Sequence, residues 1–297
     1  MRRGILHGGS RFASEVGQNV NDHPSLHVEA ARALRNASAL VVATGAGMGI
    51  DSGLPDFRGD QGFWKAYPAY ERIGLSFVDA ANPDRFEEDP AFGWGFYGHR
   101  LGLYRDTVPH DGYRILRDWM ERLSLPGFAV TSNVDGQFQK AGWDPQRVHE
   151  VHGSIHHLQC TVPCQDDVWE CREDVPVDPV TLRAGKIPAC RHCGRVARPN
   201  ILMFGDGAWL PDRSALQGRR FQAFLEEHDA ERVVVLEIGA GTAVATIRWL
   251  SERLGRSPGS LVVRVNPREA DIRPPHLGLP EGALAALQGI DRALRAG

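Results

Sequence analysis

Four of the five cysteines stand in two closely spaced pairs. Three residues separate Cys160 from Cys164, two separate Cys190 from Cys193, and 25 residues lie between the pairs. This spacing predicts one tetrahedral zinc ion held by four thiolates. Since four protein ligands leave no open position for water, we expect a structural and not a catalytic metal. Cys171 remains an alternative to Cys164 as the second ligand.

A glycine-rich run from Thr44 to Gly59 follows a short apolar stretch, residues 39–43. That stretch has the length and β-branched content of a buried parallel strand. Glycines directly after such a strand let the backbone approach a ligand and turn its N–H groups toward phosphate. The spacing of Gly45, Gly47 and Gly49 differs from the usual dinucleotide fingerprint. The glycines alone therefore favour a nucleotide site only slightly over an ordinary tight loop.

Three further polar side chains have types suited to chemistry. Asn133 and Asp135 follow a strand predicted at residues 128–131, and ligands of open α/β sheets bind outside the carboxyl ends of strands. Taken singly, Asn and Asp in such places are more often turn formers. Histidine can serve as a general base, because its unperturbed pKa lies close to physiological pH, but His152 stands near His149, His156 and His157, and any single one of these could be structural.

Periodicity predicts the elements that must position these residues. We expect helices at about 25–37, 110–122, 219–228 and 281–294, and strands at 39–43, 128–131, 232–238 and 261–265, the last of these being the final strand. Residues 60–106 have no strand pattern but many aromatic side chains, as expected of helices packed as a lid over a cleft. Residues 1–24 show no clear periodicity and are interpreted as a loose arm.

Together these motifs resemble the signature segments of the sirtuins, which are NAD-dependent protein-lysine deacylases. The resemblance runs from about residue 36 to residue 290, in the family's order. It includes the run ending in Pro-Asp-Phe-Arg, the Asn-Val-Asp-Gly segment, the His-Gly-Ser at His152 and the cysteine pairs. It continues through the Phe-Gly-Asp segment ending at Asp206 and the Asn-Pro at Asn266. Chance agreement across six ordered motifs is not credible.

The chain departs from the family's pattern in several places. Ser132 stands where the family has Gln, and its shorter side chain must weaken or reroute the contact with the nicotinamide ribose. Residues 239–241 replace Gly-Thr-Ser, so glycine backbone must donate to phosphate in place of hydroxyls. The first cysteine pair has one additional intervening residue, and Asp206 replaces Glu.

The resemblance implies an α/β fold, with a Rossmann-type parallel sheet, helices on both faces and a small zinc-binding and helical domain. The cleft then lies between the two parts. We expect an N-terminal arm at 1–24, an NAD-binding domain at 25–60, 107–155 and 201–297, a helical lid at 61–106 and a zinc module at 156–200.

The resemblance also implies the NAD site. Asn133 and Asp135 would hold the nicotinamide amide, and Phe57 would screen the ribose C1′ from water. The acyl-lysine oxygen attacks C1′ as nicotinamide leaves, His152 accepts a proton, and the acyl group ends on ADP-ribose. The implied NAD-binding residues are Gly45, Ala46, Gly47, Met48, Asp56, Phe57, Arg58, Ser132, Asn133, Val134, Asp135, His152, Gly239, Ala240, Gly241 and Asn266.

The substrate channel implied by the family comprises Ile201, Leu202, Met203, Phe204 and Gly205. Tyr97 and Arg100 further resemble a pair found in sirtuins that accept succinyl- and malonyl-lysine. Their spacing places both side chains on one helix face, where they can bind a carboxylate. Alternatively, Tyr97 packs in the lid core and Arg100 pairs with a nearby acid, namely Glu87, Glu88 or Asp106.

Composition excludes several other classes of protein. The content of 42% hydrophobic and 24% charged residues is that of a soluble globular protein, and the net charge of -3 gives no footprint for nucleic acid. No apolar run approaches the length of a membrane span, and no secretory signal is recognised, so a cytoplasmic enzyme is expected. An NAD glycohydrolase or mono-ADP-ribosyltransferase, which needs the same NAD pocket, is the alternative function. The oligomeric state is not indicated.

Overall fold

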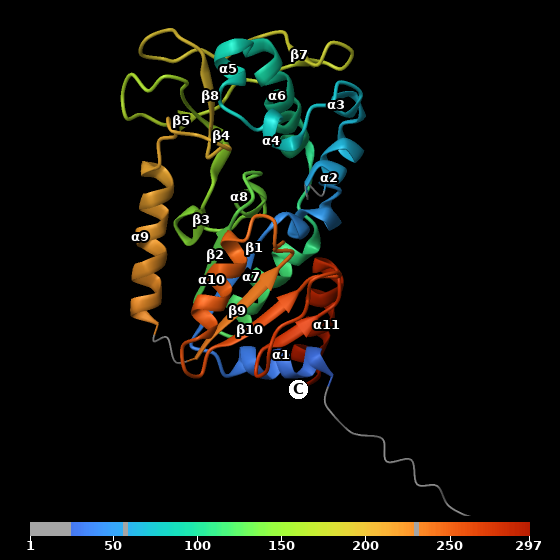
Figure 1. The fold of residues 1–297 in the computed structure, drawn as a ribbon. Helices are drawn as coiled ribbons and strands as arrows, with labels where there is room; N and C mark the ends of the chain where they lie inside the picture. The colour runs from blue at the N-terminus through green and yellow to red at the C-terminus, as the bar shows by residue number, and fades with distance from the viewer. Residues whose placement is uncertain (1–24, 56–58, 229–231) are drawn as a thin grey trace, which may run out of the picture.

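A computed structural model describes residues 25–55, 59–228 and 232–297. Its centre is a parallel sheet of six strands in the order β11-β10-β9-β1-β2-β3 (Figure 1). Every neighbouring pair in this sheet is parallel. The expected Rossmann-type sheet is therefore confirmed. Its strands are β1 (Ala39–Thr44), β2 (Gly127–Thr131), β3 (Val148–Glu150), β9 (Val233–Ile238), β10 (Leu261–Val265) and β11 (Leu277–Leu279).

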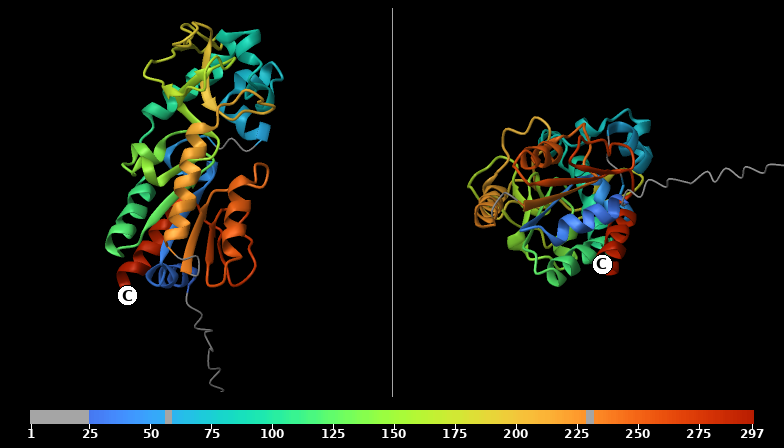
Figure 2. Two further views of the ribbon diagram at one scale, coloured as in Figure 1. Left: turned by 90° about the vertical axis from the view of Figure 1, so that its left-hand side faces the viewer. Right: turned by 90° about the horizontal axis from the view of Figure 1, so that it is seen from below.

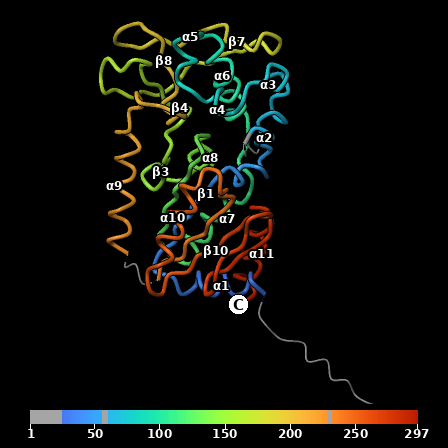
Figure 3. Tube along the Cα trace, viewed as in Figure 1, coloured from blue at the N-terminus to red at the C-terminus, as the bar shows by residue number. Residues whose placement is uncertain are grey.

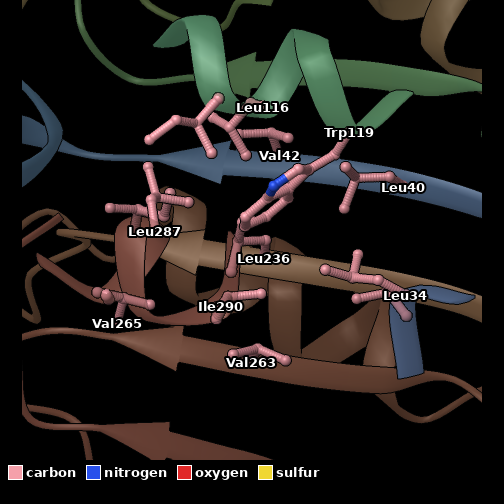
Figure 4. Close-up of a cluster of buried hydrophobic side chains, with 14 of the residues drawn as sticks. Leu34, Leu40, Val42, Leu116, Trp119, Leu236, Val263, Val265, Leu287 and Ile290 are labelled. Carbon is pink, nitrogen blue, oxygen red and sulfur yellow. The ribbon is translucent and has the colours of Figure 1, made fainter. Parts of the chain in front are cut away.

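Helices cover both faces of this sheet, as the two views in Figure 2 show. One face packs against α1 (Leu26–Arg35), α7 (Asp111–Arg122) and α11 (Ala283–Ala296), with Trp119 and Ile290 fully buried between the layers (Figure 4). The opposite face packs against α9 (Asp212–Glu227) and α10 (Thr246–Gly255). Because both faces are covered, every residue of β1 is buried, which explains its continuous apolar sequence.

The second part of the molecule lies beyond the carboxyl ends of the main strands (Figures 1 and 3). It combines an antiparallel sheet in the order β5-β4-β8, a two-stranded ribbon and helices with an aromatic core around Phe63 and Trp94. Its helices are α2 (Gly59–Ala66), α3 (Pro68–Arg72), α4 (Phe77–Ala80), α5 (Arg85–Glu88) and α6 (Pro90–Asp106). Its strands are β4 (Gly153–Cys160), β5 (Trp169–Glu170), β6 (Val177–Asp178), β7 (Arg183–Ala184) and β8 (Ala197–Ile201).

Short elements connect the two parts. Residues 46–52 of the glycine-rich run form the 3-10 helix η1 (Ala46–Ser52), and the Asn-Val-Asp-Gly segment leads into α8 (Gln137–Lys140). A second 3-10 turn, η2 (Pro145–Arg147), precedes β3. In the part of the chain that the structure describes, no helix combines the length and the apolar character needed to cross a membrane.

The predicted elements are largely present, with several corrections. The helix expected from residue 25 is α1, and Ser25 caps it by accepting the N–H of Val28 at 3.4 Å. The helix expected at 219–228 begins earlier, at Asp212, and α10 was not predicted. The strand at 261–265 is not the final one, because the three-residue strand β11 follows it. Strand β8 ends at Ile201, so the rest of the predicted substrate channel, residues 202–205, lies outside the strand.

Candidate active site and metal centre

A cavity of about 780 Å³ lies between the two parts of the molecule. Loops from the carboxyl ends of β1, β2 and β9 form one wall, as expected for a parallel α/β sheet. Side chains from α4 and α6 and from the segment after β8 form the other. The predicted residues that line it are Gly45, Ala46, Ser132, Asn133, Val134, Asp135, His152, Gly239, Ala240, Gly241, Tyr97, Arg100, Ile201, Leu202, Met203 and Phe204.

Two glycine loops contact each other, backbone against backbone, beside this cavity. The N–H of Gly47 donates to the carbonyl of Gly239 at 3.1 Å, and Gly45 donates to Ile238 at 3.0 Å. Gly239 has a φ of 64°, and a Cβ there would lie 2.4 Å from the Cα of Gly47. A side chain at Gly45 would likewise meet the Gly239 carbonyl at 2.8 Å. These positions accept only glycine, and they leave the cavity wall as bare backbone that suits a phosphate-bearing ligand.

Three predicted residues support the wall from behind it. Gly47 and Met48 lie in η1, and Met48 is fully buried. Asn266 is also fully buried: its amide donates to the Ala240 carbonyl at 2.9 Å, while its oxygen accepts the N–H of Arg268 at 3.0 Å. The Asn266 side chain thus shapes the loops after β9 and β10, and its expected contact with a ribose stays a prediction.

Asn133 joins the ends of two neighbouring strands. Its side-chain amide donates to the Gly45 carbonyl at 3.0 Å, and its backbone N–H donates to the hydroxyl of Thr131 at 3.0 Å. The backbone N–H of Ser132 donates to the Thr44 carbonyl at 3.0 Å. The polar residues after β2 are therefore held to the glycine loop after β1.

Asp135 is buried, and burial raises its pKa to about 6. The Glu150 carboxylate raises this pKa further, whereas the Gln137 N–H, which donates to Asp135 Oδ1 at 2.9 Å, and the Arg100 guanidinium lower it. A carboxyl with this pKa is mostly ionised at neutral pH and becomes protonated in mildly acidic solution.

His152 directly precedes β4 and lines the cavity. Its Nε2 lies 3.4 Å from the hydroxyl of Thr246, the first residue of α10. Burial lowers the pKa of His152, and a hydrogen bond with the Ser132 backbone partly offsets the effect. The imidazole is therefore neutral at physiological pH, which is the state that a general base requires.

Tyr97 and Arg100 are both buried and both line the cavity, so they take part in the core and in the cavity wall. Arg100 donates to the hydroxyl of Tyr104 from Nε at 3.0 Å and from Nη2 at 2.7 Å. Its guanidinium also lies 5.0 Å from the centre of the Phe96 ring. Tyr104, four residues after Arg100 on α6, is a partner that the sequence analysis missed, although the i, i+4 spacing pointed to it.

Thr246 and His110 are further positions that the sequence analysis missed. His110 accepts the Gly112 N–H at Nδ1, so its Nε2 carries the hydrogen directed at the Met48 carbonyl, 2.9 Å away. Neither residue has a sequence signal, because each contacts its partner from a distant segment.

Gly205 does not line the cavity. The predicted residues Asp56, Phe57 and Arg58 lie outside the described residues.

Four cysteines form the metal centre. The Sγ atoms of Cys160, Cys164, Cys190 and Cys193 all lie within 4.8 Å of one another. Two of the Sγ pairs, Cys160–Cys193 and Cys164–Cys190, are separated by 3.7 Å. A tetrahedron with Zn–S bonds of about 2.3 Å has edges of about 3.8 Å, so the donor set fits zinc. Cys171 lies outside this cluster and its thiol is directed at the Glu173 carbonyl, so it is Cys164, and not Cys171, that completes the set of four.

Known proteins are similar to this chain in sequence. The model of the Sir2 family matches residues 45–245. An "NAD-dependent protein deacylase" of Aquifex aeolicus is 30% identical over 234 residues, covering 78% of this chain and 85% of that protein. An "NAD-dependent protein deacetylase" of Chromobacterium violaceum is 32% identical over 223 residues, covering 74% of this chain and 79% of that protein.

Solved structures agree in fold. A Sir2 homologue in complex with NAD has a TM-score of 0.66 at 23% identity, over 90% of this chain and 94% of that one. Sir2Tm bound to a propionylated peptide has a TM-score of 0.61 at 22% identity, over 91% of this chain and 97% of that one. At these identities the likeness shows the fold.

The zinc cluster gives a first prediction. Because closed thiolate sites contribute directly to folding, we expect about one zinc per chain and a severe loss of soluble protein for Cys190→Ser. The control is Cys171→Ser, which should keep both zinc and solubility. Metal analysis of the purified variants checks both expectations. Loss of zinc from Cys171→Ser together with its retention in Cys164→Ser would show that the ligand set is wrong.

The burial of Asp135 gives a second prediction. An unperturbed Asp has a pKa of about 3.9, so the folded state keeps this proton to higher pH than the unfolded chain does. Stability from this group is therefore lost as pH rises through about 6. We expect the free energy of unfolding of Asp135→Asn to gain about 1–2 kcal/mol relative to wild type between about pH 5 and about pH 8. Denaturant unfolding at both pH values measures this difference, and a constant offset would contradict it.

Proposed function

The chain belongs to the Sir2 family, and we propose that it removes acyl groups from protein lysines, transferring them to the ADP-ribose part of NAD with release of nicotinamide. One observation carries this proposal. A single cavity brings together the paired glycine loops, the amide of Asn133, the carboxyl of Asp135 and the neutral His152. Its other wall is apolar enough to receive an acyl-lysine chain.

Each part of the cavity has a task in this reaction. Since Gly45 and Gly47 donate within the protein, the other backbone N–H groups of these loops, as at Ala46 and Gly241, suit the pyrophosphate of NAD, which supplies the activated ribose when bound. Asn133 and Asp135 are expected to hold the nicotinamide amide, because one side chain offers donors and the other acceptors. His152 is expected to take a proton from the ribose hydroxyls, and its lowered pKa leaves it free to do so.

The segment after β8 is the proposed lysine channel. Leu202 and Phe204 remain 40% and 37% exposed although both are apolar, which marks a surface suited to a ligand. Phe204 packs against Phe77 of α4 with their ring centres 5.8 Å apart. Asp206 fixes the segment by accepting two hydrogen bonds of 2.8 Å from the guanidinium of Arg198, and both side chains are buried. An acylated peptide is the substrate class that this channel fits.

We further propose that Tyr97 and Arg100 favour an acyl group with a terminal negative charge. Arg100 brings a buried cation to the cavity wall, and its guanidinium contacts aromatic rings and the Tyr104 hydroxyl. A cation and a phenol at the end of the channel can bind a terminal carboxylate by charge-assisted hydrogen bonds. We therefore propose that succinyl-lysine is accepted at least as well as acetyl-lysine.

A cytoplasmic location remains a prediction from the sequence.

The reaction itself is tested by product analysis. Acylated peptide and NAD should yield free lysine peptide, nicotinamide and acyl-ADP-ribose in equal amounts, measured by mass spectrometry. Release of free ADP-ribose without deacylated lysine would instead identify an NAD glycohydrolase, a function that the relatives' names do not favour.

Loss of the base gives a third prediction. His152→Ala should lower turnover by about two to four orders of magnitude, the usual range for a general base, while NAD binding stays within a few-fold. Steady-state kinetics and calorimetric binding measure the two effects. His149→Ala is a matched control, because His149 lies on β3 and contacts Ser214 of α9 instead of the cavity. Deacylation by His152→Ala at nearly the wild-type rate would refute the proposed mechanism.

Replacement of the buried cation gives a fourth prediction. Arg100→Met should lower kcat/KM for succinyl-lysine by more than about tenfold, equivalent to about 1.4 kcal/mol, and spare acetyl-lysine. The comparison uses two peptides that differ only in the acyl group. Equal losses on both peptides would assign Arg100 to structure alone.

A further inference from the structure

We propose that His156 is a positioning residue that fixes the loop of residues 132–136, and thereby orients Asn133 and Asp135 toward the nicotinamide end of NAD. The inference rests on the proposed function, which assigns these two side chains to the nicotinamide amide. His156 itself does not line the cavity. It acts on the site through the backbone of the loop.

Two consecutive carbonyls of this loop are held from one strand. The Nε2 of His156 lies 2.9 Å from the Asp135 carbonyl oxygen, and the backbone N–H of Ile155 donates to the Val134 carbonyl at 3.0 Å. Both Ile155 and His156 belong to β4. The side-chain contact therefore continues a backbone contact by one residue, and together they fix the orientation of the two peptide units that flank Asp135.

The shape of the loop matches the imidazole ring. Gly136 has a φ of 69°, and a Cβ at this position would lie 2.7 Å from Cδ2 and 2.8 Å from Nε2 of His156. The bare glycine backbone thus lets the ring approach the Asp135 carbonyl. A side chain at residue 136 would displace this turn.

The contact does not depend on the protonation of His156. A carbonyl oxygen only accepts hydrogen bonds, so Nε2 must carry a hydrogen, as it does in one neutral tautomer and in the imidazolium. Burial lowers the pKa of His156, the nearby cations Arg105 and Lys140 lower it further, and the Asp135 carbonyl and Glu150 act in the opposite direction. The neutral ring with its hydrogen on Nε2 therefore holds the loop at physiological pH.

The test compares two substitutions of His156. In His156→Gln the amide N–H extends about as far as Nε2 and can donate to the same carbonyl, whereas His156→Phe keeps the ring but removes the donor. We expect His156→Phe to raise the Kd of NAD about five- to tenfold, as for one lost hydrogen bond, and the Kd of ADP-ribose less than about twofold. ADP-ribose lacks nicotinamide, so it reports on the rest of the pocket. His156→Gln should recover most of the NAD affinity.

Calorimetric binding without peptide makes this measurement independent of catalysis. A wild-type chain that fails to deacylate would refute the proposed function, yet the ratio of the two Kd values would still test His156. Equal changes in both Kd values, or no change in either, would overturn the inference. In the deacylation assay, His156→Phe should also weaken inhibition by nicotinamide, and unchanged inhibition would count against the proposal.

The matched control is His157→Phe. His157 is the next residue of β4 and is similarly buried, but its charged neighbours are Arg213 of α9 and His156. This substitution should leave the ratio of the two Kd values at the wild-type level. Thermal unfolding of all three variants separates loss of the loop contact from loss of the fold. A ratio that shifts equally in His157→Phe and His156→Phe would assign the effect to β4 as a whole.

Discussion

The structure depends on the contact between two bare backbone segments at the carboxyl edge of the main sheet. The loop after β1 and the loop after β9 approach so closely that a Cβ at Gly239 would lie 2.4 Å from the Cα of Gly47. Neighbouring parallel strands bring their carboxyl ends to the same edge, and glycine lets the two loops share hydrogen bonds there. The two loops can form this wall of the cavity because no side chain separates them.

Strand β4 connects the wall formed by the glycine loops to the rest of the site. His152 directly precedes it, Ile155 and His156 hold the loop after β2, and Cys160 at its end belongs to the zinc cluster. Cys160 lies at the opposite end of β4 from His152, and a zinc ion held by four thiolates would have no open coordination position. Its contribution is to fold the module that carries β4, and through β4 it supports the geometry of the site.

Burial controls the charge state of the groups in the cavity. It lowers the pKa of His152 and raises that of Asp135, because in both cases a low-polarity environment disfavours the charged form. The buried cation of Arg100 counteracts part of the shift of Asp135. The carboxyl and the cation are thus coupled electrostatically, whereas the pKa of His152 is set by burial and by the Ser132 backbone.

The sequence by itself indicated most strands and helices of the sheet and the two cysteine pairs, because apolar runs, glycines after strands and cysteine spacing are local signals. Its ordered motifs indicated the family, and the resemblance to that family supplied most residues of the cavity wall. The tertiary structure alone decided the close contact of the two glycine loops, the supporting role of Asn266 and the contact of His156 with Asp135. It also revealed β11 and α10. Most of these contacts join segments far apart in the chain, and their strength comes from burial and orientation, which only the folded backbone defines.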